Sequence, residues 1–136
     1  MVMKVSSRKV ILIAGILGML AVILGAFGAH GLKELLAPDQ LNSYRTGVSY
    51  QFYHTFVLLF LGVILNRNES KWFQRASFLF IVGILLFSGS IYLLSCRELI
   101  GLSSYKWLGP ITPIGGVFFI LGWLSLCIGA IKDYDK

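Results

Sequence analysis

Two histidines, His30 and His54, have the widest chemical repertoire of any side chains in this sequence. An imidazole transfers protons near neutral pH, ligates zinc or haem iron, and both donates and accepts hydrogen bonds. Glu34 follows His30 by four residues, so the two side chains would share one face of a helix. Two histidines and one such carboxylate are weak support for a metal site. We therefore predict a hydrogen-bonded polar cluster that fixes helix register, and we assign no metal and no cofactor.

The sequence holds none of the strong motifs for catalysis. It has no GxSxG nucleophile elbow, no HExxH zinc motif, no CxxC pair and no phosphate-binding Walker loop. Its long apolar runs contain no Asp, Glu, Lys or Arg, the residues that mark proton and ion pathways in membranes. We predict no catalytic residue and expect a protein that is not an enzyme.

The composition requires a membrane. The chain has 136 residues, of which 57% are hydrophobic and 13% charged, whereas about a quarter of residues are charged in soluble domains. Lys and Arg give a net charge of +6 but lie at the ends of apolar runs, so we expect no nucleic-acid partner. We predict a single all-α membrane domain, residues 1–136, folded as a compact bundle of four transmembrane helices. The spans are about residues 10–29, 50–65, 76–95 and 111–131.

The second apolar run needs a helical extension. Residues 52–65 are apolar, whereas a spanning helix needs roughly 17 to 25 residues. Pro38, Asp39 and Gln40 upstream are typical of a helix start. We predict one long helix from about Pro38 to Leu65, whose first turns form a polar extension outside the lipid.

Lys and Arg are unevenly divided between the two sides of this arrangement. Cytoplasmic loops collect these residues, so we expect both termini in the cytoplasm. The absence of an Arg- and Ser-rich transit segment favours a bacterial plasma membrane. One side carries Lys4, Arg8, Lys9, Arg67, Lys71, Arg75, Lys132 and Lys136, and the other carries Lys33, Arg45, Arg97 and Lys106.

The first apolar run also resembles a signal peptide. Lys4, Arg8 and Lys9 resemble its charged start, and the sequence from Ala26 to Gly28 resembles a cleavage site. Because the run is about twenty residues long and exceeds a usual signal-peptide core, we favour a retained span.

Small residues recur at heptad-like spacing in three of the four runs. Since seven residues are nearly two helical turns, each set lies along one face of its helix. Helices in lipid approach closely through such residues, so we predict a tight, left-handed bundle. This packing seam consists of Ala14, Gly18, Ala21, Gly25 and Gly28 in the first run, Gly83 in the third, where Ala76 and Ser90 lie seven residues to either side, and Gly115, Gly122 and Gly129 in the fourth.

Polar residues of the long second helix share one face. Tyr44, Gly47, Tyr50, Gln51 and His54 fall within a third of the helix circumference at about 100° per residue. Lipid offers these groups no hydrogen-bond partner, so they should face the bundle interior. The other histidine ends the first span on the same outward side, so the two imidazoles could meet.

Four sequence blocks occur in the order and spacing of a known family. They are GAFGAHGL, YRTGVSYQFYHTFVLL, LFSGSIYLLS and WLGPITPIGGVFFILGW. On these blocks the chain resembles the family catalogued as domain of unknown function 423, which includes animal transmembrane protein 256. The similarity spans nearly the whole chain, from about Gly15 to Trp123. The resemblance implies a small four-span membrane protein and carries no agreed biochemical activity.

On the predicted topology the four blocks meet in the outward half of the bundle. Thr112 would cap the last helix with Pro113 at its first position, and such a helix start attracts anions or carbonyl oxygens. Glycines and serines in a span also let helices touch, and we favour that structural role. The candidate ligand-binding residues are His30, Tyr50, Gln51, His54, Ser88, Ser90, Tyr92 and Thr112.

Three functions are compatible with these observations. We favour a structural or accessory protein that contacts the lipid bilayer and binds other membrane proteins or a second copy of itself. The first alternative is a binder or carrier of a small lipid-soluble molecule in an outward polar pocket around His54. The second is an enzyme or haem protein that uses His30 and His54. A carrier predicts an open interior, whereas an accessory protein predicts a filled one.

Overall fold

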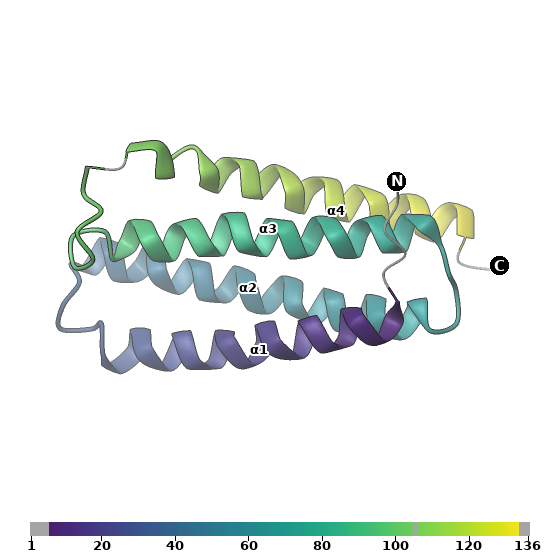
Figure 1. Cartoon of the computed structure of the whole chain (residues 1–136), viewed down its shortest axis with the longest axis horizontal. Coiled ribbons are helices and arrows are strands. Elements are labelled where there is room, and N and C mark those ends of the chain that lie inside the picture. Colours follow the sequence, from purple (N-terminus) through teal and green to yellow (C-terminus); the bar gives the residue numbers. More distant parts are fainter. Residues whose placement is uncertain (1–5, 105, 134–136) are drawn as a thin grey trace.

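Four long helices make up the computed structural model, which describes residues 6–104 and 106–133 (Figure 1). Each is long and apolar enough to cross a membrane, and the described residues contain no strand. The predicted all-α, four-span fold is therefore confirmed. The helices are α1 (Ser7–His30), α2 (Pro38–Leu65), α3 (Lys71–Ser95) and α4 (Ile111–Asp133), with a short 3₁₀ helix, η1 (Lys106–Leu108), before α4.

The start of α2 follows from three adjacent side chains. Pro38 lies in the first turn, where its missing N–H is not needed, and Asp39 places a negative charge near the helix N-terminus. Gln40 Oε1 accepts a hydrogen bond from the Ala37 N–H at 3.0 Å, which caps this turn. The single helix predicted from Pro38 to Leu65 is present with these bounds.

The start of α4 differs from the prediction for Thr112 and Pro113. The helix already begins at Ile111, so Thr112 lies inside the first turn and is not the N-cap. Its Oγ1 instead lies 2.6 Å from Ser90 Oγ of α3. The predicted cap was wrong because this side chain faces a neighbouring helix, where an interhelical hydrogen bond satisfies its hydroxyl in the absence of water.

The helices pack in chain order, with α1 and α4 at opposite edges (Figure 1). Close backbone contacts join α1 to α2, α2 to α3, and α3 to α4. The α1–α2 and α3–α4 connections lie at one end of the molecule, which we call the long-loop end. The α2–α3 connection lies at the opposite, short-loop end, where Ser70 Oγ donates a hydrogen bond to Asp133 Oδ2 at 2.7 Å.

Basic side chains are more numerous at the short-loop end. Lys4 and Lys136 from the charge count lie outside the described residues. The described basic residues there are Arg8, Lys9, Arg67, Lys71, Arg75 and Lys132, whereas the long-loop end has Lys33, Arg45, Arg97 and Lys106.

The small residues of α1 face α2. A Cβ atom added at Gly28 would lie 2.5 Å from the Tyr44 ring, closer than carbon atoms approach, so the ring occupies the space that a side chain would need. Gly18 and Gly25 also face α2, with Thr55 and Val48 as their neighbours. The remaining seam residues of α1, Ala14 and Ala21, are fully buried.

Phenylalanine rings fill the space beside the glycines between α3 and α4. A Cβ at Gly122 would lie 2.8 Å from the Phe80 ring, and one at Gly129 would lie 2.6 Å from the Phe73 ring. Glycines and rings advance together by seven residues along the two antiparallel helices, which fixes one register. The rings of Phe80 and Phe73 face Gly122 and Gly129, and the Phe119 ring faces Gly83 with the roles reversed. Gly115 differs, because it lies against the backbone of Phe87 and lets the two helices approach closely there.

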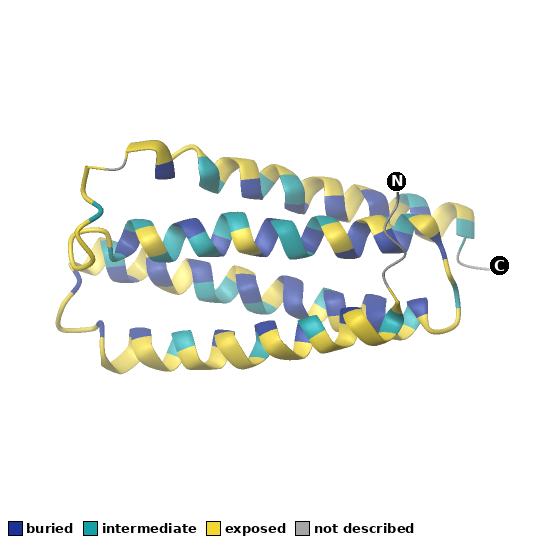
Figure 2. Cartoon of the chain, in the orientation of Figure 1, coloured by how far each residue is buried: buried dark blue, intermediate teal, exposed yellow. Residues whose placement is uncertain are grey.

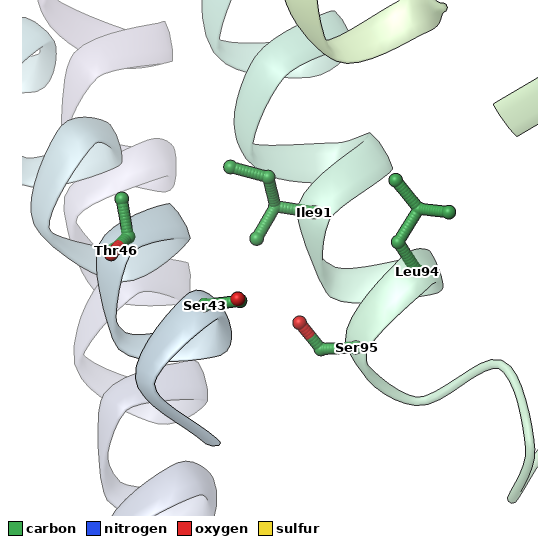
Figure 3. Close-up of a pocket in the computed structure, with 5 residues that line it drawn as sticks. All are labelled: Ser43, Thr46, Ile91, Leu94 and Ser95. Carbon is green, nitrogen blue, oxygen red and sulfur yellow. The ribbon is translucent and has the colours of Figure 1, made fainter. Parts of the chain in front are cut away.

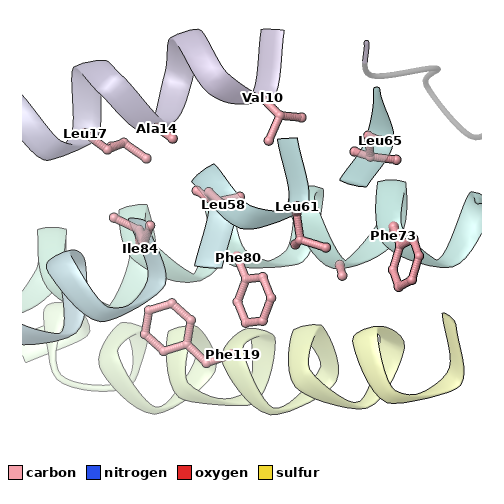
Figure 4. Close-up of a cluster of buried hydrophobic side chains, with 11 residues drawn as sticks. Val10, Ala14, Leu17, Leu58, Leu61, Leu65, Phe73, Phe80, Ile84 and Phe119 are labelled. Carbon is pink, nitrogen blue, oxygen red and sulfur yellow. The ribbon is translucent and has the colours of Figure 1, made fainter. Parts of the chain in front are cut away.

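Buried residues follow the helix interfaces and exposed residues lie on the outer faces (Figure 2). Many of the exposed residues are large and apolar. In the main cluster, side chains of all four helices meet, with the Phe80 and Phe119 rings between α3 and α4 (Figure 4). On the outside, Leu12 is 62% exposed and Ile120 is 67% exposed. Such a surface suits lipid, which solvates apolar side chains as well as a protein core does.

Candidate functional site

His54 is buried among aromatic rings, with only 5% of its surface exposed. Its Nδ1 lies 2.7 Å from the Tyr50 carbonyl oxygen, and the Trp123 indole N–H donates to Nε2 at 3.4 Å. A carbonyl only accepts and an indole N–H only donates, so both contacts select the neutral ring with its proton on Nδ1. The imidazole also stacks on Phe119, with ring centroids 3.6 Å apart and planes 2° apart. This histidine is held by packing and by two hydrogen bonds.

His30 and His54 do not meet. Gly28, near His30, packs against Tyr44, whereas Thr55, beside His54, packs against Gly18 halfway along α1. About ten residues of α2 separate these two levels, or about 15 Å along the helix. His30 is exposed at the end of α1. The two imidazoles lie apart because about four turns of α2 precede His54 and carry it to mid-depth, below the outward half.

The described residues also bring no metal site together. No three His, Cys, Asp or Glu side chains within the described ranges are close enough to hold one ion. Glu34, the carboxylate considered beside His30, lies in the connection after α1 and is exposed.

Gln51 joins three helices through the two ends of its amide. Its Nε2 donates to the Leu17 carbonyl of α1 at 2.8 Å, and its Oε1 accepts from the Tyr92 hydroxyl of α3 at 2.7 Å. The side chain is only 3% exposed. Lipid could replace neither partner, so these bonds favour one arrangement of α1, α2 and α3.

Tyr44 also bonds from α2 to a backbone carbonyl of α1, as Gln51 does, but nearer the long-loop end. The Tyr44 hydroxyl donates to the Leu24 carbonyl of α1 at 2.8 Å, and its ring packs against Tyr92 with centroids 5.1 Å apart. Tyr44 and Gln51 are seven residues apart on α2, as their acceptors Leu24 and Leu17 are on α1. The heptad spacing of Tyr44 and Gln51 is the sequence signal for this pair of interhelical bonds.

The predicted serines bond to separate helices. Ser88 Oγ donates to the Gly47 carbonyl of α2 at 2.7 Å, while Ser90 and Thr112 join α3 to α4. Tyr50 is 38% exposed, and its ring stacks on Phe87 with centroids 4.7 Å apart. Seven of the eight predicted ligand-binding residues therefore take part in contacts between or within helices, and the eighth, His30, is exposed. These seven residues form several contacts at different interfaces.

Trp123, which donates a hydrogen bond to His54, is the site residue that the sequence did not predict. Membrane tryptophans favour the two interfaces with water, but Trp123 lies in the middle of α4, beside His54 and Phe80. The position of Trp123 at mid-span, away from the usual depth of membrane tryptophans, is a sequence signal that could have predicted its contact with His54.

A small pocket does lie near the long-loop end, between α2 and α3 (Figure 3). Its volume is about 230 Å³, and it is lined by three hydroxyl-bearing residues and two aliphatic ones. The Ser95 side chain is 4% exposed, and its Oγ has no hydrogen-bond partner. The Ser43 and Ser95 hydroxyls point toward one another across the gap. The lining residues are Ser43, Thr46, Ile91, Leu94 and Ser95.

Comparison with known proteins places the chain among bacterial membrane proteins. It is 39% identical to UPF0382 inner membrane protein YgdD of Escherichia coli strain K12 over 127 residues, which cover 93% of this chain and 92% of that protein. It is 43% identical to a UPF0382 membrane protein of Staphylococcus saprophyticus over 130 residues, covering 91% of this chain and 98% of the relative. No solved structure matches it. The family described as protein of unknown function (DUF423) matches residues 24–116, and the chain belongs to this family.

Proposed function

We propose that this membrane protein is a non-catalytic accessory component that acts by binding other membrane proteins. The observation that carries the proposal is the use of interior polar groups in holding the helices together. Gln51, Tyr92, His54 and Ser88 all bond within or between helices. Among the described residues, the buried side-chain polar atoms without a partner are Thr55 Oγ1 and Ser95 Oγ. Recognition of a partner then falls to the outer surface.

The outer face of α1 offers a surface suited to another transmembrane helix. Leu12, Met19 and Val22 are 62%, 57% and 60% exposed, and Gly15 lies between them with open space beside it. Their spacing of three and four residues puts them on one face of α1. Helices associate in lipid by close packing at such small residues.

Photo-crosslinking in native membranes tests this proposal. Benzoylphenylalanine placed at Leu12 or at Met19 should give one and the same protein adduct, identified by mass spectrometry. Placement at Ile120 of α4, which is equally apolar and exposed, should not give that adduct. Lipid adducts alone at all three positions would contradict an accessory role at α1.

We further propose that the host is the bacterial plasma membrane, with both termini in the cytoplasm. The larger number of basic residues at the short-loop end supports this orientation, and relatives described as inner membrane proteins support the location. A phosphatase reporter that is active only outside the cytoplasm should be inactive after Lys136 and active when inserted after Ser103. The reverse pattern would overturn the orientation.

A second candidate function is binding of a small lipid-soluble molecule. The Ser95 hydroxyl, which has no hydrogen-bond partner and lies at the 230 Å³ pocket, favours this function. The binding site would then be the pocket between α2 and α3 and not the surroundings of His54. The ligand would carry a carbonyl or hydroxyl oxygen that accepts from Ser95 and an apolar part that contacts Ile91 and Leu94. Solvent extracts of the purified protein should contain a compound that Ser95→Leu, which fills the pocket, does not retain. Identical extracts would exclude this function.

A further inference from the structure

Two adjoining cavities lie at the short-loop end, between the start of α1 and the end of α2. Their volumes are about 330 Å³ and 450 Å³. Both are lined by Ser7, Arg8, Asn66 and Arg67. Neither cavity is lined by Gln51, by His54 or by a residue of the pocket at Ser95, so the two cavities need an explanation of their own.

The larger cavity carries two positive charges and no negative one. Arg8 lies in the first turn of α1 and Arg67 lies just after α2, so the two guanidinium groups come from different helices. Within the described part of the chain, neither forms an ion pair with a carboxylate. Glu69 lines only the smaller cavity. The larger cavity is therefore the one that attracts an anion.

The wall of the larger cavity becomes apolar toward the middle of the membrane. Ile11 and Val63 complete its lining, and they are 40% and 61% exposed. Both belong to the spanning helices, within two turns of the short-loop end. An occupant that satisfies the whole cavity has an anionic group at headgroup level and a hydrocarbon chain directly below it.

We propose that this cavity binds an anionic phospholipid, with its phosphate between Arg8 and Arg67 and an acyl chain against Ile11 and Val63. The planar guanidinium group presents paired N–H donors that match phosphate oxygens, and the Asn66 amide lines the same space. Basic pockets between transmembrane helices bind anionic headgroups in this way. The site is separate from the α1 face and from the Ser95 pocket, so it does not depend on either proposed function.

Native mass spectrometry of the full-length protein in detergent tests the site. Phosphatidylglycerol and phosphatidylcholine with identical acyl chains serve as the two probes. We expect a retained phosphatidylglycerol adduct in the unmodified protein and about tenfold or more weaker binding in the double variant Arg8→Gln, Arg67→Gln, because charge-assisted bonds are lost. Equal retention of the two lipids by the unmodified protein would overturn the proposal.

Two further variants separate the cavity from general surface charge. Lys71→Gln, Arg75→Gln removes the same two charges at the same end but outside the cavity, and it should retain the adduct. Val63→Trp fills the apolar wall and leaves both arginines in place, and it should lose the adduct. Two results would show that no such cavity site exists. One is that Lys71→Gln, Arg75→Gln weakens phosphatidylglycerol binding as much as Arg8→Gln, Arg67→Gln does, and the other is that Val63→Trp retains the adduct fully.

Competition identifies the source of the phosphate. Inorganic phosphate or glycerol phosphate added to the loaded protein should not displace phosphatidylglycerol, because neither has an acyl chain to contact Ile11 and Val63. Displacement by inorganic phosphate at concentrations similar to those of the lipid would assign the site to a free anion and overturn the lipid proposal. Unchanged thermal midpoints would show that each variant remains folded.

Discussion

Gln51 and His54 lie on the same helix and hold their neighbours in different ways. Gln51 bonds to α1 and α3 through its amide, whereas His54 is fixed by stacking on Phe119 and by the indole of Trp123. In lipid, a polar group that loses its partner finds no water to replace it. Single side chains can therefore contribute measurably to this fold.

The bond between Gln51 and Tyr92 should show energetic coupling. We expect the variants Gln51→Leu and Tyr92→Phe each to destabilise the protein and the double variant to cost less than their sum. The expected coupling is about 0.6 to 1.7 kcal/mol, the range for interhelical hydrogen bonds in membranes. Unfolding by dodecyl sulfate in mixed micelles, followed by circular dichroism, measures it. Tyr53→Phe, at a tyrosine that is 59% exposed, is the control, and strictly additive costs would contradict the coupling.

Replacing His54 should lower the thermal midpoint of the protein in detergent. His54→Ala removes the ring that stacks on Phe119 and leaves the Trp123 indole N–H without its acceptor. A donor left unpaired away from water costs about 1 to 3 kcal/mol, and lipid offers the Trp123 indole no replacement. His30→Ala is the matched control, because His30 is exposed at the end of α1. Equal midpoints for the two variants would argue against a structural role for His54.

The burial of His54 could be predicted from the sequence, but its neighbours could not. Its polar face on α2 followed from helical periodicity, since lipid excludes polar groups from the outside. The depth of His54 depends on how α2 is aligned beside α1 and α4, and a residue pattern within one helix does not contain that alignment. For the same reason the sequence left open whether His54 contacts His30, and it did not reveal the contact with Trp123.

At the scale of elements, the register of α3 and α4 is set by rings and glycines that repeat together. Phe80 occupies the space beside Gly122, and Phe73 occupies the space beside Gly129 one heptad away. One heptad in the other direction, Gly115 lets the Phe87 backbone approach. Sliding α4 by a single residue would bring side chains against the rings and open gaps beside the glycines. The pairs thus define one alignment, as knobs and holes do in a coiled coil.

Enlarging Gly122 should be costly, and shrinking its neighbour should compensate. Gly122→Val places carbon where the Phe80 ring lies, and overpacking of this kind costs about 1 to 3 kcal/mol. In the Gly122→Val background, Phe80→Ala should destabilise less than it does alone, because the valine fills part of the space. The same micelle unfolding assay measures both effects. Gly116→Val is the control, because a Cβ there would lie 3.9 Å from the nearest atom of Phe87. Equal losses of stability in the two valine variants would refute this register.

Helix bounds were the best predicted feature at this scale. Pro38, Asp39 and Gln40 act locally, so the start of α2 could be predicted from their chemistry. Thr112 has an equally good local signal for a cap, yet its hydroxyl bonds Ser90 on another helix. Local signals fail where a side chain has a better partner across an interface. The spacing of the small residues likewise predicted which face of each helix packs closely. It did not predict which aromatic rings of the neighbouring helix occupy the space beside the glycines.

At the scale of the whole molecule, the sequence determined the number of spans but not their lateral order. The α1–α2, α2–α3 and α3–α4 interfaces place α1 and α4 at opposite edges. A bundle closed into a ring would instead bring those two helices together. This arrangement leaves the outer faces of α1 and α4 available for lipid or for a partner.

Cysteine cross-linking distinguishes the open order from a closed ring. In a background with Cys96→Ser and Cys127→Ser, the pair Ser70→Cys with Asp133→Cys should form a disulfide on oxidation with copper phenanthroline. Their present side chains are hydrogen-bonded at 2.7 Å, and cysteines can be joined when their Cα atoms lie within about 7 Å. The pair Ser7→Cys with Asp133→Cys, between the edge helices at the same end of the molecule, should stay reduced.

Intact mass after denaturation and maleimide labelling counts the free thiols, and non-reducing gels separate disulfides formed between two copies of the chain. Equal intramolecular yields for both cysteine pairs would mean that α1 and α4 are neighbours. The exposed face of α1, on which the proposed partner packs, would then be covered by α4. The measurement of the lateral order therefore also tests whether this face of α1 is free to bind a partner.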